Sequence, residues 1–138
     1  TKVYEKEGSI PRSLLVEDRF GRTRTGKTEL VRTLKSEVFS NPKPTKLIQF
    51  ILRIATSEKD CVVDFFGGSG TTAAAVQTLA HKCKVISVQI PEITQEKSEA
   101  YKAGFKKISD ITIERVKRVI QGYGDTRNPS SRASRSTR

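Results

Sequence analysis

The chain has 138 residues, of which only 35% are hydrophobic, and 26 Lys and Arg against 15 Asp and Glu give it a formal net charge of +11. This length supports one modest core, expected between about Phe39 and Ile120, and the positive excess favours a polyanionic partner, most simply nucleic acid, unless it only keeps the chain soluble. The lack of a long apolar run argues against a membrane partner, and two cysteines without a secretory signal or zinc spacing indicate reduced thiols in a cytoplasmic protein.

Residues 1–37 carry little apolar periodicity, so we expect a loop-rich region with one short helix at about Thr28–Lys35. Four basic residues gather around two glycines in this region: Arg19, Arg22, Arg24 and Lys27. Two interpretations remain open for this basic cluster, namely contact with a DNA backbone and a merely solvated loop.

The segment Gly21–Thr28 matches the phosphate-loop pattern letter for letter. A phosphate loop follows a buried strand, whereas the short apolar run Leu14–Val16 leads directly into the charged residues 17–19. We therefore interpret this match as chance.

Residues 44–121 alternate between helical and strand patterns. Pro44 suits the first turn of a helix, and apolar residues then recur at helical spacing: Leu47, Ile48, Ile51, Leu52 and Ala55. After a polar turn we expect a strand at 61–66, a helix at 71–80, a strand at 84–90, and helices at about 94–104 and 110–121. This alternation predicts an α/β fold with a parallel sheet and flanking helices, followed by a disordered basic tail at 122–138.

The segment Cys61–Thr72 is the most informative, because an apolar strand ends there in an acid, two phenylalanines, a glycine-rich turn and two threonines. Glycines let the backbone approach a ligand closely, and the start of the next helix offers N–H groups to an anionic group. Gly68–Ala73 also fits the dinucleotide fingerprint, which expects an acid about 20 residues further on. Gln89 occupies that place, so a dinucleotide-binding oxidoreductase is the weaker alternative.

The segment 64–72 resembles the S-adenosylmethionine motif of amino-group DNA methyltransferases. Asn41–Ile48 is similar to the Lys-Pro-x-x-Leu motif that precedes it in one permuted class, and three later segments continue the likeness: Val88–Glu92, Glu96–Gly104 and Ile108–Val116. Together they resemble the C-terminal part of the modification subunit of type III restriction-modification systems. The resemblance implies a partial Rossmann-like methyltransferase fold, incomplete in this chain, with residues 1–37 ending a target-recognition region and 38–121 binding the cofactor.

This resemblance assigns ten residues to binding S-adenosyl-L-methionine: Lys43, Pro44, Asp64, Phe66, Gly68, Ser69, Gly70, Thr71, Thr72 and Gln89. The two glycines would leave room for the cofactor, and the three hydroxyl residues would hold its carboxylate. Asp64 would pair with the cationic amino group of the cofactor or a bridging water, or alternatively stabilise the glycine turn. Phe66 would pack against the adenine or the sulfonium side, or belong to the core.

Three further positions complete this expected site. Lys43 would pair with the cofactor carboxylate, and Pro44 would help to close the methionine end. Gln89 stands where related enzymes often carry an acid for the ribose hydroxyls, and Glu92 is its possible substitute. His81, the only histidine, has no partner motif and is expected at the surface.

An expected catalytic motif is missing. Methyltransferases of this type hold the target base with an Asp-Pro-Pro-Tyr-like motif, and the sequence contains no Pro-Pro dipeptide. We therefore assign no catalytic residue and expect the chain alone to be inactive. The resemblance still implies an adenine-N6 DNA methyltransferase that acts on double-stranded DNA, as a homodimer with a restriction subunit. The non-enzyme alternative is a basic nucleic-acid-binding module.

Overall fold

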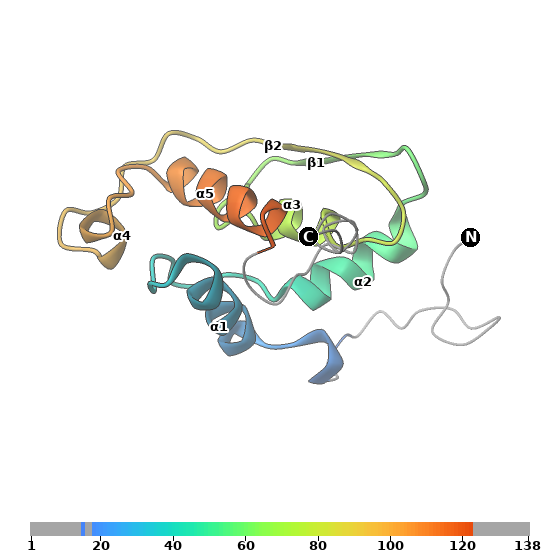
Figure 1. Cartoon of the computed structure of the whole chain (residues 1–138), viewed down its shortest axis with the longest axis horizontal. Coiled ribbons are helices and arrows are strands. Elements are labelled where there is room, and N and C mark those ends of the chain that lie inside the picture. The colour runs from blue at the N-terminus through green and yellow to red at the C-terminus, as the bar shows by residue number, and fades with distance from the viewer. Residues whose placement is uncertain (1–14, 16–17, 123–138) are drawn as a thin grey trace, which may run out of the picture.

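The computed structural model describes Leu15 and residues 18–122, which form a mixture of helices and a small two-stranded sheet (Figure 1). The elements in chain order are η1 (Asp18–Phe20), α1 (Thr23–Leu34), α2 (Thr45–Ala55), β1 (Cys61–Asp64), α3 (Thr71–Val76), β2 (Lys84–Ser87), α4 (Glu99–Lys102) and α5 (Ile108–Ile120). Apart from Gly122, the predicted basic tail lies outside the described residues, as do positions 1–14, 16 and 17.

The two strands form a parallel sheet, which confirms the predicted strand–helix–strand unit. Their register pairs Cys61 with Lys84 and Asp64 with Ser87. Both strands are shorter than predicted, because the chain turns after Asp64 and regular pairing ends at Ser87. Two backbone bonds continue beyond the strands, from Val88 N–H to Asp64 O (2.7 Å) and from Gly67 N–H to Val88 O (2.9 Å). These bonds fix the glycine-rich turn against the end of β2.

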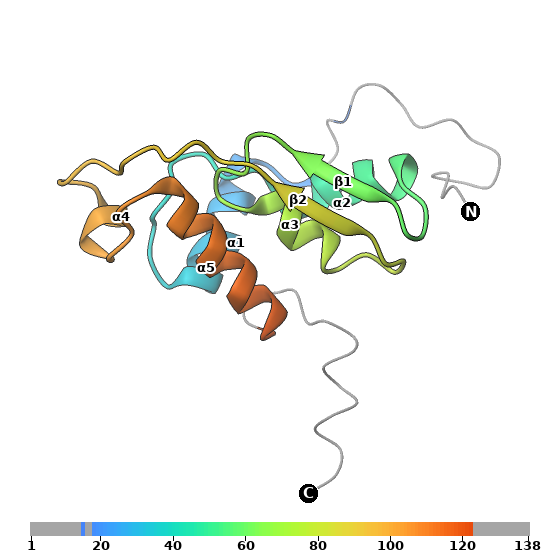
Figure 2. The same cartoon turned by 90° about the horizontal axis from the view of Figure 1, so that it is seen from above.

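Among the described residues, helices cover one face of this sheet. Figures 1 and 2 both show α2 and α3 on the same side of β1 and β2. One core cluster joins these helices to the sheet, and it contains Ile48, Leu52, Val62, Ala75, Val76, Leu79, Cys83 and Val85. The residues that alternate with the inward-facing ones are exposed, including Val63 (47%), Ile86 (53%) and Val88 (45%). The sheet therefore has one packed face and one apolar face that the described residues leave open.

A second core cluster lies between α1 and α5. Its buried members are Leu30, Leu34, Val38, Ala100 and Ile111. The expected start of the core near Phe39 is therefore wrong, since buried residues begin at Phe20. Helix α1 also starts at Thr23, five residues before the predicted Thr28. Tertiary packing stabilises this Gly- and Thr-containing segment as a helix despite its weak apolar periodicity.

Gly26 explains how α1 approaches the segment that leads into α2. A Cβ atom on Gly26 would lie 2.2 Å from Pro42 O and 2.9 Å from the carbonyl carbon of Lys43. Only a glycine permits so close a contact between helix and backbone. The stretch that matches the phosphate-loop pattern is thus largely the first turns of a helix, in agreement with its interpretation as chance.

The remaining boundaries differ from the predictions in smaller ways. Pro44 is the N-cap of α2 and precedes its first turn. Helix α3 ends at Val76, and the predicted helix at 94–104 is reduced to the single turn α4. Cys61 and Cys83 are both free thiols, Cys61 exposed and Cys83 half-buried. Within residues 18–122, no helix has the length and apolar character needed to cross a membrane.

Candidate functional site

The glycine-rich turn 65–70 joins β1 to α3 at the carboxyl end of both strands. Asp64 begins it by accepting a hydrogen bond from Phe66 N–H at its own Oδ1 (2.9 Å). Gly68 N–H donates to the side-chain Oε1 of Gln89 (2.7 Å), and Gly70 N–H donates to Gly67 O (2.7 Å). The turn is therefore tied to the residues that follow β2. Carboxyl ends of parallel strands are where α/β sheets bind their ligands.

A cavity of about 200 Å³ opens beside this turn. It is lined by Phe39, Asn41, Lys43, Ile48, Asp64, Phe66, Gly67, Gly68, Ser69, Thr71 and Thr72. Seven of the ten predicted cofactor residues are therefore brought together: Lys43, Asp64, Phe66, Gly68, Ser69, Thr71 and Thr72. The cavity combines a lysine, a carboxylate, aromatic rings and exposed backbone, so it suits a ligand with both charged and apolar parts.

Three predicted residues lie outside this lining. Pro44 is buried at the start of α2, next to Lys43. The side chain of Gln89 accepts from Gly68 N–H, so Gln89 supports the turn from the end of β2. Gly70 faces α5, because a Cβ there would lie 3.2 Å from Thr112 O. Its backbone φ of +76° also favours glycine. The need for glycine at 70 thus arises from packing on α5 and from backbone conformation.

Sequence reasoning missed four lining residues: Gly67, within the glycine-rich turn itself, and Phe39, Asn41 and Ile48. Phe39 and Asn41 stand just before the Lys-Pro motif, and Ile48 lies one helical turn after it. Because these three residues flank a motif that was expected to close the site, the sequence could have indicated that they line it.

The hydroxyl groups of Ser69 and Thr71 point away from solvent. Ser69 is 4% exposed and Thr71 is 7% exposed, and their oxygens lie 3.1 Å apart. Thr71 Oγ1 donates to Lys43 O at 3.3 Å. Both hydroxyls also accept from Nη1 of Arg115, with Thr71 Oγ1 at 2.9 Å and Ser69 Oγ at 3.3 Å. Among the three hydroxyl residues expected to face the cofactor, only Thr72 is half-exposed.

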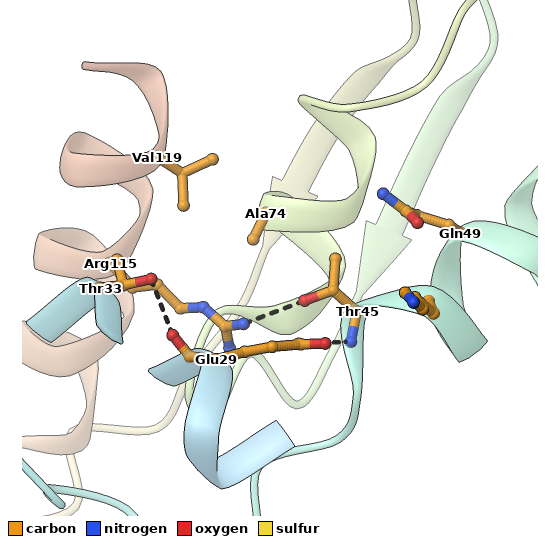
Figure 3. Close-up of a pocket in the computed structure, with 8 residues that line it drawn as sticks. Glu29, Thr33, Thr45, Gln49, Ala74, Arg115 and Val119 are labelled. Carbon is orange, nitrogen blue, oxygen red and sulfur yellow. Dashed lines mark hydrogen bonds between the residues drawn. The ribbon is translucent and has the colours of Figure 1, made fainter. Parts of the chain in front are cut away.

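Arg115 of α5 is the largest fully buried side chain among the described residues, with 2% exposure. Figure 3 shows its guanidinium reaching between α1 and α2, beside a cavity of about 150 Å³. Nη2 donates to Thr45 Oγ1 (3.2 Å), while the Glu29 carboxylate accepts from Thr45 N–H (2.9 Å). Burial lowers the pKa of Arg115 below its ordinary value, to about 10, and the nearby Glu29 carboxylate opposes that shift. Arg115 therefore stays charged at neutral pH.

His81, expected at the surface, is half-buried, and its Nε2 lies 2.9 Å from Thr56 Oγ1. This contact joins the segment before β2 to the end of α2, away from the cavity beside the glycine-rich turn.

The predicted basic cluster lies on η1, on α1 and in the link between them. Arg22 pairs with Asp18 (2.9 Å), Lys27 pairs with Glu37 (2.7 Å), and Arg19 stacks on Phe20 at 4.8 Å. A wider open groove of about 480 Å³ runs along α1 and is lined by Arg22, Arg24, Thr25, Thr28, Glu29, Arg32 and Lys46. The structure thus adds Arg32 and Lys46 to the basic surface, because the helical spacing of α1 places Arg32 on the same side as Arg24 and Thr28.

Comparison with known proteins identifies the family. The model of the DNA methylase family matches residues 4–115. The chain belongs to this family. A family of methyltransferases requires a methyl donor, which is generally S-adenosylmethionine. The resemblance to type III modification subunits, predicted from the motifs, is confirmed by the relatives.

The chain is 39% identical over 103 residues to the Mod subunit of the type III restriction-modification enzyme EcoPI of Escherichia phage P1, covering 72% of this chain and 16% of that protein. It is 36% identical over 128 residues to the EcoP15I Mod subunit of Escherichia coli, covering 90% of this chain and 20% of that protein. It is also 35% identical over 107 residues to the type II methyltransferase M.KpnI of Klebsiella pneumoniae, covering 75% and 26%. The chain thus spans between 16% and 26% of the length of these relatives.

Proposed function

We propose that this chain is the cofactor-binding portion of a site-specific DNA methyltransferase that transfers a methyl group to the N6 amine of adenine in a type III restriction-modification system. The cavity at the carboxyl end of the two parallel strands carries this proposal. Two of the relatives are named as type III Mod subunits and a third as a type II methyltransferase, which supports the reaction class and the system.

The cavity residues fit S-adenosylmethionine by their chemistry. Lys43 supplies a cation for the carboxylate of the cofactor, and Asp64 supplies an anion for its amino group. Phe39 and Phe66 offer aromatic faces for the adenine or the sulfonium. The methyl group that the cofactor supplies is the one transferred to DNA. The volume of about 200 Å³ is below the roughly 300–1,000 Å³ usual for ligand pockets, so we infer that a longer protein completes this site.

The open face of the sheet supports a partial Rossmann-like fold. A parallel sheet is normally covered on both faces, whereas Val63, Ile86 and Val88 are exposed here. We propose that further elements of a longer methyltransferase cover this face and extend the two strands. The chemistry of base binding would reside there, since the sequence lacks an Asp-Pro-Pro-Tyr-like motif. The chain alone is then inactive in methyl transfer.

The groove along α1 is the proposed contact for the DNA backbone. Its basic residues Arg22, Arg24, Arg32 and Lys46 lie on one surface, and the chain carries a net charge of +11. Such a surface favours salt-sensitive binding that does not depend on base sequence. Homodimer formation and association with a restriction subunit are further proposals, supported by the likeness to type III Mod subunits.

A calorimetric titration of the purified chain with S-adenosylmethionine, its demethylated product and NAD tests the proposed site. We expect binding of the first two and none of NAD. A preference for NAD, or no binding by a chain whose circular dichroism shows it to be folded, would contradict the proposal. The target base is tested separately by sequencing DNA from cells that express a longer protein with this region. N4-methylcytosine in place of N6-methyladenine would refute the adenine assignment.

A further inference from the structure

We propose that Arg115 is a positioning residue that holds both walls of the cofactor cavity in their binding arrangement. This inference rests on the proposed function, and it assigns to α5 a part in cofactor binding. Arg115 itself does not line the cavity beside the glycine-rich turn. It acts through the residues that do.

One wall of the cavity is the glycine-rich turn, and Arg115 holds it from behind. Nη1 donates to the backbone oxygen of Ser69 (3.2 Å), to Ser69 Oγ (3.3 Å) and to Thr71 Oγ1 (2.9 Å). All three acceptors are buried with the guanidinium, so water does not compete for them. Hydrogen bonds from a charged donor are about twice as strong as neutral ones.

The other wall contains Lys43, and Arg115 reaches the chain around Lys43 by two routes. Nη2 donates directly to Thr45 Oγ1 (3.2 Å). The second route passes through Thr71, whose hydroxyl accepts from Nη1 and donates to Lys43 O (3.3 Å). One guanidinium thus links two segments that are far apart in sequence and that meet across the cavity. Figure 3 shows the direct bond to Thr45 and the neighbouring bond from Thr45 to Glu29.

The energetic cost of this arrangement argues that it serves more than stability. Burial lowers the pKa of the guanidinium to about 10, and Arg115 Nε has no hydrogen-bond partner among the described residues. Because the folded-state pKa lies below the ordinary value, the charged form disfavours folding at every pH below about 10. Apolar residues of similar volume often replace such buried charges without loss of stability. Arginine at this position therefore adds little to stability. By ordering the two walls of the cavity, however, it lowers the entropy cost of ligand binding.

Arg118 provides a matched control on the same helix. It is half-buried, its Nε donates to Glu114 (2.7 Å), and its Nη1 donates to Thr33 O (3.1 Å). Its bond to Thr33 joins α5 to α1, its bond to Glu114 stays within α5, and neither bond reaches a wall of the cofactor cavity. Replacing either arginine by methionine removes one charge and one set of hydrogen bonds from α5.

The test compares S-adenosylmethionine binding and backbone amide exchange in Arg115→Met, Arg115→Lys and Arg118→Met. We expect Arg115→Met to weaken binding by roughly 10- to 100-fold, because charge-assisted hydrogen bonds that order the walls are lost. Amide exchange at residues 67–72 should accelerate in the same variant. Arg115→Lys should fall between the wild type and Arg115→Met, since one ammonium replaces the two-pronged donor. Arg118→Met should change the affinity by less than about twofold, whatever stability it loses.

Two results would overturn the inference. One is equal affinity in Arg115→Met and Arg118→Met, with unchanged exchange at residues 67–72. The other is a loss of affinity in Arg115→Lys that is fully explained by its lower free energy of unfolding. If the wild-type chain does not bind S-adenosylmethionine, the proposed function fails, and the exchange rates at residues 67–72 still decide whether Arg115 orders the turn.

Discussion

The rear of the glycine-rich turn and the outer face of the sheet differ in how fully the described residues bury and bond them. At the rear, Ser69 and Thr71 are buried and bonded to Arg115, and Thr112 donates to Gly68 O. On the outer face, Val63 and Ile86 of the paired strands remain exposed. The conformation of the turn is therefore determined within this chain, whereas the described residues leave the outer face of the sheet open.

The largest expected effect comes from Gly70→Leu, which disrupts the packing of the glycine-rich turn against α5. The new side chain would start 3.2 Å from Thr112 O, at a backbone φ of +76°. Overpacking and backbone strain should together lower the free energy of unfolding by about 2–4 kcal/mol, and the displaced turn should lose cofactor binding entirely. Urea unfolding and calorimetric titration measure the two effects.

Gly104→Leu is the control for Gly70→Leu. Gly104 also has a positive φ, +94°, but a Cβ atom added there would meet no other atom within 4 Å. It should lose only about 1–2 kcal/mol from backbone strain and keep its cofactor affinity. Equal losses in the two variants would show that contact with Thr112 does not matter.

The second-largest effect should come from separating α1 from the cavity wall that contains Lys43. Gly26→Ala places a Cβ 2.2 Å from Pro42 O, so the helix and the segment at 42–43 must separate. We expect a net loss of about 1–3 kcal/mol in unfolding free energy, although alanine is the better helix former by about 1 kcal/mol. Cofactor affinity should fall with it, because Lys43 lines the cavity. A Gly26→Ala variant more stable than the wild type would mean that α1 does not pack as described.

The sequence predicted well those parts of the sheet and the turn that depend on local residue patterns. The strand, glycine turn, helix and second strand occur in the expected order, and the two strands pair in parallel. These features were predictable because alternating apolar residues and glycines favour a structure through neighbours a few positions away. Seven of the ten residues predicted to bind the cofactor line one cavity, and their role in binding stays a prediction.

The rear of the turn was not predictable in the same way, since it depends on contacts between distant segments. Helix α1 was expected to be mostly loop, and nothing local shows that Gly26 packs on Pro42. Arg115 carried one readable signal. It shares the buried face of α5 with Ile111 and Val119, four residues away on each side. A charged residue in an apolar helical stripe indicates a buried polar contact, but its partners become visible only in the fold.

A third effect separates two interpretations of Asp64 at the front of the turn. Asp64→Asn keeps an oxygen that accepts from Phe66 N–H but removes the negative charge. If the carboxylate pairs with the amino group of the cofactor, affinity should fall roughly 10-fold with little change in stability. Asp60→Asn is the matched control, because Asp60 Oδ2 accepts from Ser57 N–H (2.7 Å) outside the cavity. Unchanged affinity in Asp64→Asn would leave Asp64 a turn-stabilising residue alone.

The smallest expected effect concerns the open face of the sheet. Ile86→Thr replaces a 53% exposed side chain on β2 by one of similar strand propensity, so this chain should lose less than about 0.5 kcal/mol in unfolding free energy. In a longer protein that covers the face, the same change would bury an added hydroxyl and remove apolar contacts, at a cost of about 1–3 kcal/mol. Urea unfolding of Ile86→Thr in both proteins measures the difference. Val85→Thr provides the reference, because Val85 already packs against the helices and should be costly in both. Equal small losses for Ile86→Thr in the two proteins would show that this face stays in solvent. The contrast between the buried rear of the turn and the open outer face of the sheet would then hold in the longer protein as well.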